Sequence, residues 1–177
     1  MPSVFSKFTD TLSVSNFTNL DNLLNGGTGD ATFTDNADGI LRSFPSGEGP
    51  NSIPSTATLV GIQFFVSATP GAGSFSFTFT PQKGATTSGN AQTGQYTGAQ
   101  TKLFGGSSEL FGLTFSSIGD IAAFRLRLQF TSVTGTATLN SGTNQLRPTF
   151  HYTLPFSNKV YNTSGKFSIT SGKVSIT

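Results

Sequence analysis

Residues 74–80 alternate without a break between a hydroxyl side chain and a phenylalanine. Phe75, Phe77 and Phe79 fall at every second position, and serines and threonines fill the positions between them. In a β-strand, successive side chains point to opposite faces of the sheet. The segment therefore predicts a strand with one phenylalanine face in a core and one hydroxyl face outside it.

Similar alternation recurs along the chain and indicates the fold class. Long strands are expected at residues 56–67, 123–131 and 146–154, and shorter ones at 31–34, 39–44, 101–104, 110–115 and 135–140. Pro148 marks the third long segment as an edge strand or as the start of a strand. Ser117 caps an expected helical turn at 117–121, whereas the polar residues 81–98 are expected to form a long loop that is either mobile or makes contacts. Eight to ten strands separated by turns predict an all-β fold, a two-sheet antiparallel sandwich of the jelly-roll kind with a C-terminal β arm.

The composition limits both stability and chemistry. The 177 residues include 18 phenylalanines and no cysteine, only 34% are hydrophobic and only 10% are charged, while serine and threonine occupy 50 positions. Such a sparse core favours oligomerisation or docking on a larger assembly. The lack of cysteine excludes disulfides and thiol chemistry. We expect a sandwich domain at residues 31–156, with an N-terminal extension, 1–30, packing on it and a C-terminal arm at 157–177.

The charges are distributed unevenly along the chain. All eight acidic residues lie at or before Asp120, and six of the ten basic residues follow it. Arg125 and Arg127 alternate on one expected strand, so we predict that they contact a partner. Different charge at the two ends favours head-to-tail or carrier-bound packing, although scattered solvated charges explain the pattern equally well.

A seven-residue repeat ends the chain. A Gly-Lys pair precedes four strand-forming residues at 165–170 and again at 172–177. Each copy predicts a small strand, and two copies are too few for a solenoid. We expect an arm that adds strands to a neighbouring subunit, with a tail folded back on its own sandwich as the alternative. The predicted partner-binding residues of the arm are Lys166, Phe167, Ile169, Lys173, Val174 and Ile176.

No residue pattern predicts catalysis or a cofactor. The lone histidine, His151, lies in an alternating segment without an evident base or nucleophile beside it, so we expect no enzyme activity. Asp30, Asp35 and Asp38 crowd one loop, where a calcium site and a simple turn remain open alternatives. Few basic residues and no exposed aromatic platform argue against nucleic-acid binding. Tyr96, Tyr152 and Tyr161 leave lectin-like glycan binding open.

Targeting signals are not evident. Lys7 and Asp10 interrupt the region where a signal peptide would be apolar, and no apolar run has membrane-spanning length. We therefore expect a protein that is made in a cytoplasm and has no membrane partner.

Two segments carry a family resemblance. Residues 53–62, IPSTATLVGI, resemble the "IP-x-x-A-x-I-x-GI" opening of a group of small β-sandwich proteins encoded by tailed bacteriophages. Residues 105–115, GGSSELFGLTF, followed by Asp120-Ile121, Phe124, Ala137 and His151-Tyr152, are similar to the group's "GG-x-S-x-LWG-x-TW … D-I … F … A … YY" order. Phe111 and Phe115 stand where the group has tryptophan. The resemblance spans residues 31–154.

The resemblance implies a structural component of the virion with no catalytic residues. The expected function is a capsid decoration or cement protein that assembles as a homo-oligomer, with a trimer favoured, on the major capsid protein. A tail, baseplate or fibre component that contacts tail proteins is the first alternative. A glycan-binding adhesion module is the second. The expected location is the virion, after synthesis in the host cytoplasm.

Overall fold

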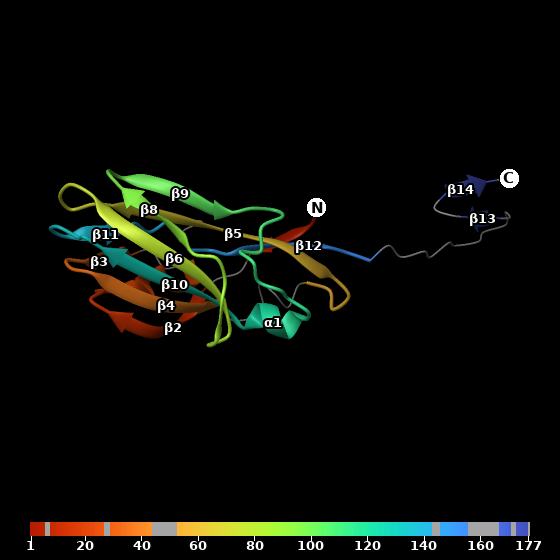
Figure 1. The fold of residues 1–177 in the computed structure, drawn as a ribbon, viewed down its shortest axis with the longest axis horizontal. Coiled ribbons are helices and arrows are strands. Elements are labelled where there is room, and N and C mark those ends of the chain that lie inside the picture. Colours follow the sequence, from red (N-terminus) through yellow and green to blue (C-terminus); the bar gives the residue numbers. More distant parts are fainter. Residues whose placement is uncertain are drawn as a thin grey trace.

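Two antiparallel sheets packed face to face form the body of the protein (Figure 1). The structure is a computed structural model, and it describes residues 1–5, 8–26, 29–43, 53–142, 146–155, 167–170 and 173–176. The first sheet, sheet A, contains β1 (Ser3–Phe5), β3 (Ala31–Phe33), β5 (Thr58–Thr69), β9 (Gln100–Gly105), β11 (Ala137–Leu139) and β12 (Thr149–Thr153). The second, sheet B, contains β2 (Phe8–Ser15), β4 (Ala37–Ser43), β6 (Phe75–Lys83), β7 (Thr87–Ser88), β8 (Gln92–Tyr96) and β10 (Phe124–Thr131).

The strand order has jelly-roll connectivity. Neighbouring strands run β3-β11-β5-β9 in sheet A and β4-β10-β6-β8 in sheet B. Along the chain, β3, β4, β5 and β6 alternate between the sheets, as do β8, β9, β10 and β11. This is the eight-strand arrangement of a jelly roll. The predicted all-β two-sheet sandwich is confirmed.

Phenylalanine rings fill the space between the sheets. In β6, Phe75, Phe77 and Phe79 are buried, while the serines and threonines between them are partly exposed. The ring of Phe130 in β10 packs 5.5 Å from that of Phe79 and 4.7 Å from that of Phe33. The face assignment predicted from the alternation is confirmed for β6, and β10 shows the same alternation of burial.

The first thirty residues supply strands to both sheets. β1 pairs with β12, and β2 pairs with β4 at the margin of sheet B. Between β2 and β3, the 3-10 helix η1 (Leu20–Gly26) buries Leu20, Leu23 and Leu24 in the core. The segment expected as an extension packing on the domain thus contributes strands of the sandwich itself.

Two segments differ from the expected elements. Residues 81–98 are not a structureless loop, because β6 continues to Lys83 and both β7 and β8 pair back onto it. β7 and β8 lie at the margin of sheet B, where polar side chains can stay in contact with water. In β8, only Tyr96 is buried. Residues 110–115 form no strand. Phe111 and Gly112 both adopt positive φ angles, 54° and 72°, which a strand does not allow.

The helical content among the described residues is small. The helix α1 (Ile118–Ala122) follows Ser117, whose hydroxyl accepts a hydrogen bond from the backbone N–H of Asp120 at 3.1 Å. The cap predicted at Ser117 is therefore present. No helix in the described part of the chain is both long and apolar enough to cross a membrane.

Candidate assembly surfaces

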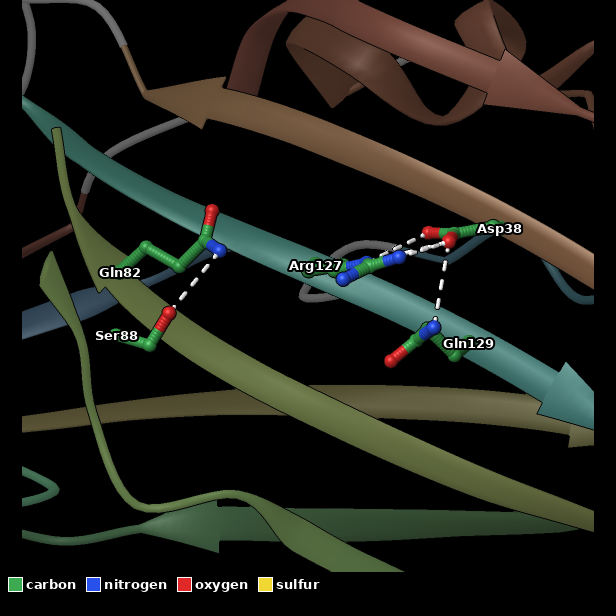
Figure 2. Close-up of polar contacts among 5 residues, drawn as sticks. All are labelled: Asp38, Gln82, Ser88, Arg127 and Gln129. Carbon is green, nitrogen blue, oxygen red and sulfur yellow. Dashed lines mark hydrogen bonds and ion pairs between the residues drawn. The ribbon is translucent and has the colours of Figure 1, made fainter. Parts of the chain in front are cut away.

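The outer face of sheet B carries a polar network across β4 and β10 (Figure 2). The Nε of Arg127 donates to Asp38 Oδ1 at 3.0 Å, and a terminal guanidinium nitrogen donates to Asp38 Oδ2. Gln129 Nε2 also donates to Asp38 Oδ2, at 3.3 Å. The ladder between the strands places these groups together, because Gln129 pairs directly with Asp38 and Arg127 is two residues away on the same face.

The side chains of this network hydrogen-bond to one another within sheet B. The hydrogen bonds that Arg127 donates to Asp38 raise the pKa of Arg127 above its ordinary value and keep the guanidinium charged. Both side chains are about one third exposed, at 39% and 35%. The contact therefore holds the register of β4 against β10, and Arg127, predicted to bind a partner, is occupied by Asp38.

Arg125 differs from Arg127 in its surroundings. It pairs with Arg42 on one side and with Gln82 on the other. Its Nε is buried and has no hydrogen-bond partner among the described residues. Gln82 instead donates to Ser88 Oγ at 3.4 Å, as Figure 2 shows. Of the two predicted arginines, Arg127 is paired with a carboxylate, whereas the Nε of Arg125 has no partner among the described residues.

A small pocket of about 210 Å³ lies beside the network. Its lining consists of Ser15, Asn36, Ala37, Asp38, Gln129, Phe130 and Thr131. Asp38 is already bound by Arg127 and Gln129, and the ring of Phe130 is fully buried in the core. The pocket consequently offers hydroxyl and amide groups but no exposed ring on which a sugar could stack.

The three aspartates weighed as calcium ligands serve separate local contacts. Asp30 accepts from the backbone N–H of Ser141 at 2.5 Å, and Asp35 accepts from that of Asn36 at 2.6 Å. Asp38 belongs to the network with Arg127. Among the residues that the structure describes, no three histidine or acidic side chains gather as metal ligands would.

His151, the lone histidine, and Asp120 both lie in structural surroundings. Asp120 Oδ2 accepts from both the backbone N–H and the hydroxyl of Ser116 at 2.8 Å, and these hydrogen bonds lower the pKa of its carboxyl. Burial lowers the pKa of His151, helped by the α-amine of Met1. In the described structure its Nε2 is buried without a hydrogen-bond partner.

The C-terminal repeat forms a hairpin of its own. β13 (Phe167–Thr170) pairs antiparallel with β14 (Lys173–Ile176), so that Phe167 is opposite Ile176 and Ile169 is opposite Val174. Directly opposite residues share a face of the ladder, and the four apolar positions therefore share one face. Among the described residues neither strand joins sheet A or sheet B, and Figure 1 draws the hairpin apart from both. The predicted residue Lys166 lies outside the described residues.

The two segments that carry the family resemblance pack against each other. Glu109 O accepts from the backbone N–H of Ile62 at 2.8 Å, and Ile62 O accepts from that of Gly106 at 3.1 Å. A Cβ on Gly61 would lie 2.3 Å from the carbonyl carbon of Ser107, so only glycine allows this close approach. The Phe111 ring is buried, and its centroid lies 5.9 Å from that of Phe64. The two motifs thus form one unit of the fold.

The strand β9 is a surface that the sequence did not reveal. Leu103 is 52% exposed, and its neighbour in the ladder is the half-buried Phe65 of β5. The sequence predicts strand at 101–104, but the exposure of Leu103 depends on strand order, which the sequence does not give.

Comparison with known proteins provides no family assignment. No family model and no curated protein matches the chain. Among solved structures, that of TmCBM61 in complex with beta-1,4-galactotriose aligns with 87% of this chain and 89% of its own, at 10% identity. Its TM-score of 0.25 is too low to support an argument about fold or function.

Proposed function

We propose that this chain is a non-enzymatic structural protein of a bacteriophage virion that decorates or cements the capsid shell as an oligomer. The observation that carries the proposal is the β13–β14 hairpin, which pairs with itself and with neither sheet of the sandwich among the described residues. An isolated two-stranded hairpin is marginally stable in water. It gains most by adding its strands to another sheet.

Three further observations support this proposal. The sandwich has jelly-roll connectivity, an architecture that occurs in viral capsid domains and also in lectins, so this is support by analogy. The two segments that resemble phage β-sandwich proteins form one packed unit around Gly61 and Ile62. Asp38, Arg127 and Asp120 make hydrogen bonds within local structure, which is the role that a structural protein would give them.

Copy number in the purified particle tests the proposal. Quantitative gel densitometry should give a copy number comparable to that of the major capsid protein. A tail, baseplate or fibre component would instead occur in a low multiple of three or six. Absence of this chain from purified particles would contradict both the capsid proposal and the tail alternative.

The polar pocket beside Asp38 favours a second candidate, a glycan-binding adhesion module. Saccharide binding by the isolated protein, lost on Gln129→Ala, would support this candidate. Arg125→Ala is the matched control on the same strand, because Arg125 does not line the pocket.

A further inference from the structure

The strand β9 is a regular edge of sheet A. It pairs with β5 without a register shift from Gln63↔Gly105 to Ala68↔Gln100. Gln63 also pairs with β12, and Ala68 also pairs with β11. A residue within a sheet has one strand on each side, so β9 lies opposite β11 and β12. Its outer side has no strand partner in the described part of the chain.

The other edges of the sandwich are less suited to accept a strand. β2 is interrupted by two register shifts, β1 and β3 have three residues each, and β8 exposes polar residues. Short, bulged or polar edges resist pairing with another chain. β9 has six residues and exposes Leu103. The ammonium of its lysine, Lys102, lies 5.4 Å over the Tyr96 ring, which draws that charge toward the sandwich.

We propose that β9 accepts the β13–β14 hairpin of a second copy of this chain, which extends sheet A across the subunit boundary. This inference rests on the proposed function, in which many copies assemble on one particle. The hairpin has four apolar positions on one face of its ladder, and β9 exposes Leu103 beside Phe65. Apolar contact would accompany the backbone hydrogen bonds of strand addition.

Charge and symmetry also favour this occupant. Residues 121–177 contain no acid, and β14 begins at Lys173. The exposed Glu109 lies in the loop that follows β9 and provides one acidic group near this edge, although its carboxylate also accepts a hydrogen bond from the backbone N–H of Phe111. A contact between the arm of one subunit and the edge of the next is head-to-tail, and such contacts form a ring where the rotation between subunits closes and an open filament where it does not. A closed ring of three subunits would match the trimer that is expected from the sequence.

Disulfide trapping between two different variants tests the contact directly. The chain has no cysteine, so one protein carries Leu103→Cys and the other carries Val174→Cys or Ile176→Cys. Opposite residues on paired strands have Cβ atoms about 4.5–5.5 Å apart, which is close to disulfide geometry. After oxidation of the mixture, we expect a covalent heterodimer. The control replaces the first variant with Leu12→Cys, which lies on the β2 edge and is 37% exposed.

Heterodimer yield no greater than that of the Leu12→Cys control would overturn the assignment to β9. A double variant, Leu103→Cys with Val174→Cys, distinguishes the origin of the hairpin. If its only product is an internally cross-linked monomer, the hairpin folds back on its own β9, and the second-copy proposal fails.

A charge on the edge provides an independent measurement. Leu103→Lys should raise the dissociation constant of the oligomer about tenfold or more, because a lysine on an edge strand opposes pairing. Leu12→Lys should leave that constant unchanged, and both variants should melt like the wild type when all three are compared as monomers at low concentration. Equal effects of the two substitutions on the oligomer would contradict the proposal. These assays use the isolated protein, so their failure is distinct from absence of the chain in particles.

Discussion

At the scale of single residues, Phe79 illustrates what holds the sheets together. Its side chain is fully buried, and its ring centroid lies 4.5 Å from that of Phe77 and 5.0 Å from that of Phe104. Phe79→Ala should lower the free energy of unfolding by about 3–5 kcal/mol, because it leaves a cavity between the sheets. Thr78→Ala, on the outer face of the same strand, should change it by less than about 0.5 kcal/mol. Urea unfolding of both variants checks this, and equal losses would mean that the face assignment is wrong.

His151 makes stability depend on pH in a defined direction. Burial holds its pKa in the folded protein below the ordinary value of 6.5. As the pH falls, the unfolded chain therefore takes up this proton before the folded protein does. The free energy of unfolding should be fully retained above about pH 7.5 and fall as the pH drops through 6.5. The loss should stop below the folded-state pKa.

Urea unfolding between pH 8 and pH 5, about one and a half units either side of 6.5, measures this effect. His151→Gln should remove the part of the pH dependence that lies near pH 6, whereas Asp120→Asn should not. Asp120 has a lowered pKa, so its contribution is present at neutral pH and is lost only in stronger acid. An unchanged profile for His151→Gln would show that another group titrates in this range.

Sequence predicted side-chain faces more readily than side-chain partners. Alternation alone placed Phe75, Phe77 and Phe79 in the core, because a strand fixes the direction of every second side chain. It could not predict that Arg127 binds Asp38, since 89 positions separate the two residues and only strand order brings them together. For the same reason, Asp38 was weighed as a calcium ligand and Arg127 as a partner contact.

At the scale of elements, the packing of loop 105–109 on β5 depends on glycine. Gly61→Ala would place a methyl group within 2.5 Å of the Gly106 and Ser107 backbone. We expect a loss of about 1–3 kcal/mol in the free energy of unfolding, because backbone on both sides resists displacement. Gly106→Ala is the matched control, since a Cβ there meets nothing within 4 Å. Comparable melting temperatures for the two variants would contradict the close packing of the two motifs.

Strands with a regular alternation of apolar and polar residues were predictable from the sequence. Strands that form only because a neighbouring strand offers an edge were not. β6 and β10 alternate strictly and were located within a few residues. Residues 81–98 have no apolar period, yet β7 and β8 form because β6 offers them an edge. Residues 110–115 have a strand-like pattern, but Phe111 and Gly112 adopt positive φ angles and form a turn, in which Phe111 O accepts from the backbone N–H of Asn90.

At the scale of the whole molecule, a jelly-roll sandwich is followed by a hairpin that pairs with neither of its sheets among the described residues. Removal of residues 164–177 deletes β13 and β14 but none of the strands of sheets A and B. The truncated sandwich should therefore keep its core and unfold at the same temperature as the full chain. Its attachment should weaken, because the segment proposed to add strands to a neighbour is gone.

Occupancy of the truncated chain on purified particles, measured beside its melting temperature, tests whether the arm attaches the sandwich to a neighbour. We expect an unchanged melting temperature and at least about a tenfold loss of occupancy relative to the full chain, which corresponds to about 1.4 kcal/mol of binding free energy. Unfolding on truncation would show that the arm is a strand of its own sandwich. Full occupancy of a folded truncated chain would show that the arm has no part in assembly.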